Sequence, residues 1–375
     1  MTTLHPAVER AEALLAIDRR AEAEALMRQR LAEDPEDIRA WVKLAKCHLV
    51  EPKNADAALD ATEQALALGP ADVGALVMRS HALWAAGGGR LPEAEKVLRE
   101  VVRLSPEDWY GYAKLADTVF TAELLRLGRA GGGAVRADEV DAAARRAEEL
   151  AMAALRLGPE EVYAHEVVWK IASLSGNTTV ADQMDEAILR LDPQHQYALA
   201  RRTEKAATAP GVKATEAATL YADALSAAPE SASLRSKLDD ASYRLLRGVR
   251  WLALLCLALA GTMLDLFAVE GETQRELPVS LGQRLWTLVP MAAIWALGAL
   301  LRYRRLRNGI RINLRSLIRC RRWPRIVLAQ AAWAMLCALL IAQLPWSDRT
   351  VPQILFWTGL LPTAATILFD RKKRG

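Results

Sequence analysis

Few residues in this chain have the types and spacing that catalysis or metal binding requires. The histidines stand in no HExxH-type motif, and the cysteines form no CxxC pair. Cys47 and His48 are adjacent, but sequence neighbours do not face each other on a helix. The sequence therefore predicts no enzyme active site, no metal site and no cofactor. The histidines and cysteines are His5, His48, His81, His165, His195, Cys47, Cys256, Cys320 and Cys337.

Two glycine triplets resemble phosphate-binding loops only in their glycine content. Neither Gly87-Gly88-Gly89 nor Gly131-Gly132-Gly133 belongs to a GxxxxGK[ST] motif. Glycine also provides flexible turns between helices. We expect both triplets to be such turns, with the second inside an insertion over residues 127–138.

A strongly basic segment could bind anionic groups through its charge. Residues 302–325 contain ten arginines and no acid. Apolar residues recur on one helical face (Leu306, Ile310, Leu314, Leu317 and Ile318), and five arginines lie opposite: Arg304, Arg311, Arg315, Arg319 and Arg322. A basic amphipathic helix suits the lipid headgroup layer. The arginines would then contact headgroups and fix the topology. The alternatives are topology alone, docking of the acidic repeat domain, and nucleic-acid binding, which is disfavoured because the arginines would be held against a bilayer.

The two parts of the chain differ in charge and hydropathy. Residues 1–249 contain 31 Lys and Arg against 39 Asp and Glu, a charge of −8, whereas residues 250–375 contain 18 against 6, a charge of +12. The second part holds four apolar stretches of 17–19 residues, close to the length that crosses a bilayer. These stretches are Trp251–Val269, Leu285–Leu301, Ile326–Leu344 and Val351–Phe369.

Charge placement orients the four predicted spans. The basic segment and the tail after residue 370 are rich in arginine and lysine, whereas the other two connections are not. The positive-inside rule therefore places both termini in the cytoplasm and the protein in the cell membrane. No signal peptide opens the sequence. Asp265 is the one carboxylate within a predicted span, and Gln330 and Gln343 are expected to bridge helices or to face an interface.

A proline phrase recurs along the first part of the chain. A helical run ends, and a proline follows a few residues later, at spacings of 35, 36, 53, 34 and 36 residues. Proline ends helices because it lacks an N–H and clashes with the preceding turn. The prolines are Pro35, Pro70, Pro106, Pro159, Pro193 and Pro229.

This period resembles that of the tetratricopeptide family. Residues that match its signature are Trp41, Leu44 and Ala45 in one repeat, Tyr112, Leu115 and Ala116 in another, and Ala94 and Ala217 in second helices. The resemblance covers about residues 5–230. It implies stacked helix pairs whose concave groove binds a protein or peptide.

The sequence thus predicts an all-α protein with a tetratricopeptide-like solenoid of about six degenerate pairs and a four-helix transmembrane bundle. The predicted parts are the solenoid (1–230), a capping helix (231–248) with a bend at Gly248, the membrane domain (249–370) and a basic tail (371–375). The predicted function is a membrane-anchored scaffold or adapter for a cytoplasmic partner, with a basic partner favoured by the charge of −8. The alternative is a transporter or an envelope or secretion-assembly component whose repeats regulate the bundle.

Overall fold

The computed structural model describes the chain except residues 1–4, 51–53, 133–134, 268–275, 301–302, 305 and 373–375, and it describes side chains up to residue 367. The contacts divide the chain into two compact units, Met1–Ala198 and Leu199–Gly375. Each unit is described by itself. The described residues form helices and contain no strand, which confirms the all-α prediction.

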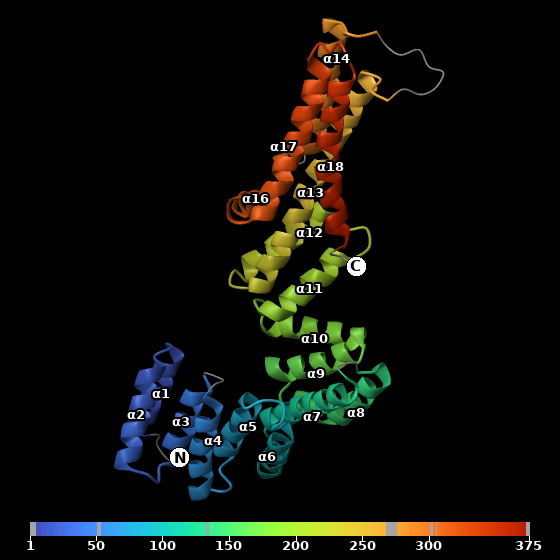
Figure 1. The fold of residues 1–375 in the computed structure, drawn as a ribbon. Helices are drawn as coiled ribbons and strands as arrows, with labels where there is room; N and C mark the ends of the chain where they lie inside the picture. The colour runs from blue at the N-terminus through green and yellow to red at the C-terminus, as the bar shows by residue number, and fades with distance from the viewer. Residues whose placement is uncertain are drawn as a thin grey trace. The chain divides into compact units, whose positions relative to one another are not determined.

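Unit 1 is a succession of antiparallel helix pairs (Figure 1). Each helix packs against the next one along the chain, so every pair buries its apolar face against its neighbours. This is a tetratricopeptide-like helical repeat fold. The helices are α1 (Pro6–Ala16), α2 (Arg20–Glu33), α3 (Ile38–Leu49), α4 (Ala55–Leu68), α5 (Val73–Ala85), α6 (Leu91–Leu104), α7 (Trp109–Ala130), α8 (Ala137–Leu157), α9 (Val162–Leu174) and α10 (Thr178–Leu191).

The recurring prolines mark the turns between pairs, as predicted. The second helix of each pair ends two residues before its proline, as α2 ends at Glu33 before Pro35. The next helix then begins at a capping side chain in several repeats. The carboxylates of Asp37 and Asp72 accept from the backbone N–H three residues later, at 3.0 and 2.8 Å. Such caps satisfy N–H groups that have no partner inside the helix.

The long proline spacing reflects longer helices. Helices α7 and α8 contain 22 and 21 residues, against 11–14 in the other helices of unit 1. Residues 127–130 continue α7, and α8 begins at Ala137. The predicted insertion at 127–138 is therefore helical at both of its ends. Gly132 adopts a positive φ of 64° in the turn, and Gly133 lies outside the described residues.

Small residues lie where the paired helices approach. Most of the predicted signature residues are buried: Leu44, Ala45, Ala94, Leu115, Ala116 and Ala217 are each less than 9% exposed. Gly158 is equally constrained, because a Cβ there would lie 2.7 Å from Cγ of Trp109. Interiors are close-packed, so such sites tolerate little added volume.

Unit 2 begins within a further helix pair and continues into a bundle (Figure 1). The pair is α11 (Gln196–Thr208) and α12 (Ala214–Ala227). Helix α13 packs on α12 and then on α14, α17 and α18, and α16 lies across α12 and α13. The bundle helices are α13 (Ala232–Met263), α14 (Leu281–Trp295) with the π-helical turn η2 (Ala296–Leu300), α16 (Asn308–Cys320), α17 (Arg322–Gln343) and α18 (Thr350–Lys372).

Helix α13 links the repeat pair to the bundle without interruption. Its 32 residues pass through Gly248, so the helix does not end at the bend predicted there. A Cβ at Gly248 would meet no atom within 4 Å, which shows that no close packing requires this glycine. The predicted capping helix and the first apolar stretch therefore form one element.

Two helices in the described part of the chain are long and apolar enough to cross a membrane, α13 and α17. The four-span prediction is thus supported for two stretches by length and composition. The second predicted stretch is divided between α14, with Pro290 inside it, and η2. The fourth lies in α18, which contains Pro362 and extends beyond the described side chains.

Candidate functional site

The first helices of the pairs in unit 1 form a common layer. Helices α1, α3 and α5 contact one another in order, and α7 contacts α9. Side chains from α5, α7 and α9 enclose an open pocket of about 280 Å³ on this layer. Its lining is aromatic and cationic: His81, Trp84, Tyr110, Lys114 and Tyr163. In a repeat fold, such a layer forms an extended binding surface.

Trp84 and Lys114 form the charged wall of the pocket. The Lys114 ammonium lies 4.2 Å from the centroid of the Trp84 ring, within cation–π range. Trp84 is fixed by its indole N–H, which donates to Oγ1 of Thr118 at 2.8 Å. Burial lowers the pKa of Lys114, although Asp117 opposes this shift. Among the described residues, no carboxylate lies within 4.0 Å of this ammonium, so the pocket has a cation that an incoming acceptor can pair with.

His81 and Tyr110 form a second wall of the pocket. Nε2 of His81 lies 2.6 Å from the Tyr110 hydroxyl, so one of the two groups donates to the other. Tyr110 also packs against Tyr163, with ring centroids 5.8 Å apart. Burial, reinforced by the Lys114 charge, lowers the pKa of His81 to about 4. His81 is therefore neutral at pH 7, and the pocket carries the Lys114 charge without a second cation from this wall.

Asp117 is the centre of a hydrogen-bond network beside the pocket. Its carboxylate accepts from Nζ of Lys170 at 2.5 Å and from the Tyr163 hydroxyl at 3.3 Å. Lys170 also donates to Oγ1 of Thr121 at 2.8 Å. Asp117 is buried, and a buried carboxylate requires such partners. The network ties α9 to α7 and holds the Tyr163 ring in place.

Unit 1 is expected to lose stability through His81 as the pH falls from 7 to 5. The folded pKa of about 4 lies below the ordinary 6.5, so the unfolded chain binds the proton first and folding weakens below pH 6.5. The loss is on the order of 1–2 kcal/mol at pH 5. Hydrogen exchange of peptides from α5 and α7 at both pH values should show a smaller loss for His81→Gln than for wild type. Exposed His5→Gln is the control, and equal losses in all three proteins would exclude this role of His81.

The repeat-signature residues lie outside the pocket, with structural roles. Trp41 donates its indole N–H to the Pro35 carbonyl at 2.8 Å, and Nε2 of His165 lies 2.9 Å from the Pro159 carbonyl. Arg235 donates to the Pro229 carbonyl at 3.0 Å. In each case the side chain six residues after the proline reaches back to the turn. The residue six positions after the proline, which is Trp41, His165 or Arg235 in these repeats, thus fixes the turn between consecutive repeats.

The sequence pattern does not identify the pocket residues as a site. It places His81 in no catalytic or metal-binding motif, and it does not single out Trp84, Tyr110, Lys114 or Tyr163. The sequence feature that could have indicated the pocket is the concentration of aromatic and histidine side chains on three consecutive first helices. Because the pairing of α5 with α7 and α9 depends on tertiary geometry, spacing alone does not reveal it.

The apolar face of the basic segment packs against protein. Ile310 and Leu314 of α16 lie in a core with α12 and α13, and Leu317 is also buried. The predicted headgroup residues Arg315, Arg319 and Arg322 are exposed, and Arg311 donates to the carbonyls of Tyr303 and Arg304. Two other arginines pair with acids of unit 2: Arg307 with Asp223 at 2.5 Å, and Arg321 with Asp239 at 3.4 Å. These two arginines therefore dock the basic segment onto acids of unit 2, whether or not the exposed arginines also contact lipid.

The polar residues of the predicted spans have structural positions. Asp265 has a φ of 46° just beyond the end of α13, where its N–H donates to the Thr262 carbonyl, so it lies in a left-handed helix cap. Gln330 donates to the Pro362 carbonyl of α18 at 3.3 Å, and Gln343 to the Arg284 carbonyl of α14 at 2.8 Å. Both glutamines bridge helices, as predicted.

Neither a metal cluster nor a family match points to a further site. The described residues contain no cluster of three or more His, Cys, Asp or Glu side chains placed to hold a metal ion. The chain matches no family model and no curated protein sequence.

Several solved repeat proteins share partial similarity with the chain. YrrB, described as a TPR protein with an unusual peptide-binding site, is 17% identical over 52% of this chain and 90% of its own, with a TM-score of 0.36. A thermophilic TPR protein of Thermus thermophilus is 22% identical over 63% and 96%, with a TM-score of 0.34. Human IFIT1, as a dimer with PPP-AAAA, is 15% identical over 78% and 72%, with a TM-score of 0.41. At these scores none of them indicates a ligand for this chain.

Proposed function

We propose that the chain is a membrane-anchored scaffold whose repeat unit holds a cytoplasmic protein or peptide. The observation that carries this proposal is the open pocket between α5, α7 and α9. Its aromatic walls and its single Lys114 ammonium are presented on the layer of first helices. Aromatic side chains in partly desolvated pockets dominate the energetics of protein interfaces. We propose a binding role and no catalytic one.

The pocket chemistry specifies one contact of the partner. An apolar or aromatic side chain suits the Trp84, Tyr110 and Tyr163 walls, and a carboxylate or another acceptor suits Lys114. The net charge of −8 in residues 1–249 favours basic residues elsewhere in the same partner. The proposed partner segment therefore combines a basic overall character with one anionic or acceptor group that enters the pocket.

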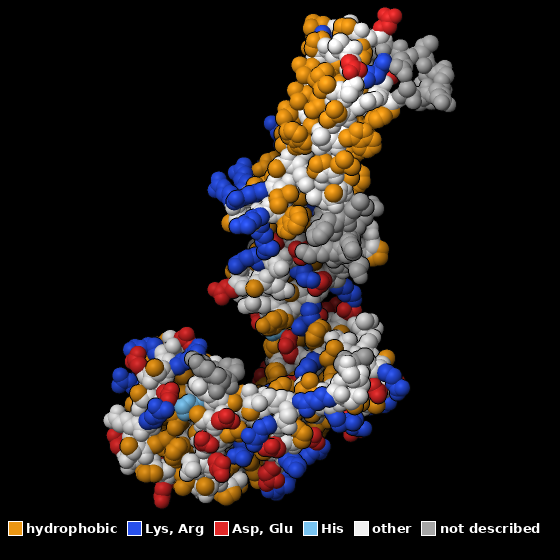
Figure 2. Space-filling model, in the orientation of Figure 1, with side chains coloured by type: hydrophobic (Ala, Val, Ile, Leu, Met, Phe, Trp, Pro, Cys, Tyr) orange, Lys and Arg blue, Asp and Glu red, His pale blue; other side chains and the backbone are white. Residues whose placement is uncertain are grey.

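The exposed apolar surface of the bundle supports membrane anchoring. Large apolar side chains cover the outer faces of α13, α14, α17 and α18, as Figure 2 shows for one face of the molecule. Contiguous exposed patches of this kind mark contact with a membrane or a partner. Examples with exposures of 46–69% are Trp251, Leu255, Trp286, Val289, Leu336, Ile354 and Trp357. We propose that all four helices cross the cell membrane and that both termini are cytoplasmic.

Lys114→Met is expected to weaken partner capture about tenfold or more. Methionine retains the apolar stem but removes the ammonium, and truncating a desolvated charge in an interface costs roughly 2–5 kcal/mol. Full-length protein would be purified from native membranes, and co-purifying proteins quantified by mass spectrometry. Lys96→Met is the matched control, because Lys96 is exposed on the second helix α6.

The outcomes separate the scaffold from its alternative. A cytoplasmic protein that follows wild type and Lys96→Met, but not Lys114→Met, supports the proposal and identifies the partner. Equal capture by both variants would exclude the pocket as its binding site. Partners that follow the bundle fragment 250–375 alone would favour a transporter or an assembly component whose repeats are regulatory.

A further inference from the structure

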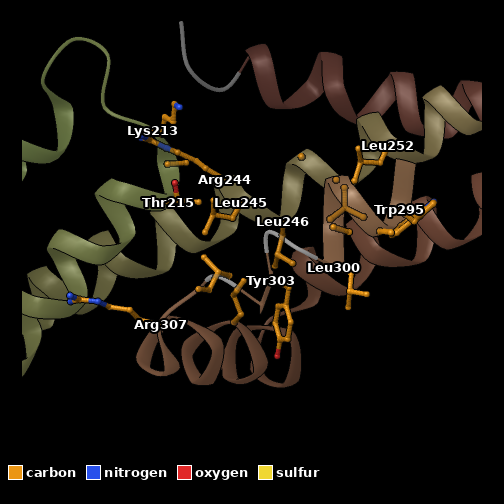
Figure 3. Close-up of a pocket in the computed structure, with 18 of the residues that line it drawn as sticks. Lys213, Thr215, Arg244, Leu245, Leu246, Leu252, Trp295, Leu300, Tyr303 and Arg307 are labelled. Atoms are coloured by element: carbon orange, nitrogen blue, oxygen red, sulfur yellow. The ribbon is translucent and has the colours of Figure 1, made fainter. Parts of the chain in front are cut away.

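A second hollow lies in unit 2, at the junction of the last repeat pair with the bundle. It has a volume of about 1320 Å³ and is bounded by α12, α13, α14 with η2, and α16 (Figure 3). Sites for small molecules usually measure about 300–1,000 Å³. The hollow is therefore large enough for a longer ligand than a typical metabolite.

One wall of this hollow is apolar. Leu246 and Leu252 project from α13, and they face Trp295 and Leu300 at the end of α14 and in η2 (Figure 3). Small residues of the same helices, Ala292, Ala296 and Ala299, complete the wall. The π-helical turn at Ala296–Leu300 widens the backbone here, and such turns are frequent at functional sites. This wall suits a hydrocarbon chain.

The other end of the hollow is cationic. Lys213 and Arg244 are both exposed and lie on the same wall, beside the hydroxyl of Thr215 (Figure 3). No carboxylate of the described residues lies within 4.0 Å of either cation. Arg307 differs, because Asp223 already holds its guanidinium at 2.5 and 2.7 Å. Two cations thus remain for an anion that enters the hollow.

The backbone at this end adds to the positive potential. Lys213 is the N-cap residue of α12, and Ala214 and Thr215 of the first turn line the hollow. The first N–H groups of a helix have no partner within it, and the helix dipole is positive at this end. Phosphate groups bind favourably at such positions. The site combines this terminus with two cations, a hydroxyl and an adjoining apolar wall.

We propose that the hollow binds one anionic phospholipid. The lipid phosphate lies against Lys213, Arg244 and the first turn of α12, and an acyl chain follows Leu252, Trp295 and Leu300. The apolar wall favours a lipid over a free anion. The two cations, which no carboxylate of the described residues pairs with, favour an anionic headgroup over a zwitterionic one. The inference rests on the proposed membrane anchoring, since the bilayer supplies the lipid. It would couple the last repeat pair to the composition of the membrane.

The test measures lipid retention by the full-length protein. Purified protein in detergent would be titrated with phosphatidylglycerol or phosphatidylcholine, and bound lipid counted by native mass spectrometry. Wild type is expected to retain phosphatidylglycerol roughly ten- to thirtyfold more tightly, given a contribution of about 1 kcal/mol from each cation. Lys213→Met/Arg244→Met should lose this preference. Arg156→Met/Arg190→Met, which removes two exposed charges of unit 1 outside the hollow, should retain it.

Further measurements distinguish a failure of the lipid-site proposal from a failure of the proposed membrane anchoring. Ala299→Phe narrows the apolar wall and should reduce retention of both lipids. Equal phosphatidylglycerol retention by the two double variants would overturn the proposal. The proposal would also be overturned if glycerol phosphate, which lacks acyl chains, displaced bound phosphatidylglycerol as effectively as added phosphatidylglycerol does. Flotation of the full chain with phosphatidylcholine vesicles tests anchoring separately, so a chain that floats but shows no charge-dependent retention refutes only the lipid site.

Discussion

Phe120→Ala is expected to lower the local stability of α7 and α8 by about 3–5 kcal/mol. Phe120 is completely buried in the core of the long repeat, where it packs with Ala116, Ala147 and Ile171. The alanines around it cannot extend into the space that the ring would leave, so a cavity would add to the lost transfer free energy. Asp117, which pairs with Lys170, lies three residues before Phe120 on the same helix.

Hydrogen exchange on the full-length chain measures this effect locally. Repeat arrays open in parts, so a single unfolding midpoint does not report on one pair. Peptides from α7 and α8 should exchange faster in Phe120→Ala, and less so in Phe120→Leu. Leu157→Ala, at a position that is 42% exposed on α8, is expected to cost less than about 1 kcal/mol. Unchanged protection in Phe120→Ala would show that the long pair does not depend on this core.

The periodic part of the fold was predictable because proline and small residues act locally. A proline prevents the helix before it from continuing, so Pro35 and Pro229 mark turns whatever the tertiary structure is. Ala45 and Ala116 likewise mark close approaches along one helix face. The insertion was harder to assign, because the residues on either side of Gly131 continue helices α7 and α8. Propensity alone does not show where a long helix ends.

Both pockets required tertiary information. The first joins His81 to Tyr110, 29 residues apart, and Trp84 to Thr118, 34 residues apart. The second joins Lys213 of the repeat pair to Trp295 of the bundle. Neither arrangement follows from the spacing of residues within one helix, so no sequence motif predicts it. The basic segment shows the same limit, since its amphipathic pattern was clear but the protein core that covers Ile310 and Leu314 was not.

Cys320 provides a direct test of the proposed membrane orientation. It is the exposed thiol of the described cysteines, at the end of α16 in the basic segment. Cys256 and Cys337 are buried, and burial raises the pKa of Cys47 to about 11, so these thiols should react slowly. A membrane-impermeant maleimide should therefore label Cys320 in inverted membrane vesicles but not in intact cells.

A relocated thiol should give the opposite pattern. Ser347 is exposed in the short connection between α17 and α18, which the positive-inside rule predicts to lie outside the cell. In a Cys320→Ser background, Ser347→Cys should be labelled in intact cells and protected in inverted vesicles. Labelling of both thiols from one side would contradict a crossing by α17, the helix that lies between them. Reversed labelling of the two would retain the crossing but place the repeat unit outside the cell, where no cytoplasmic partner could reach its pocket.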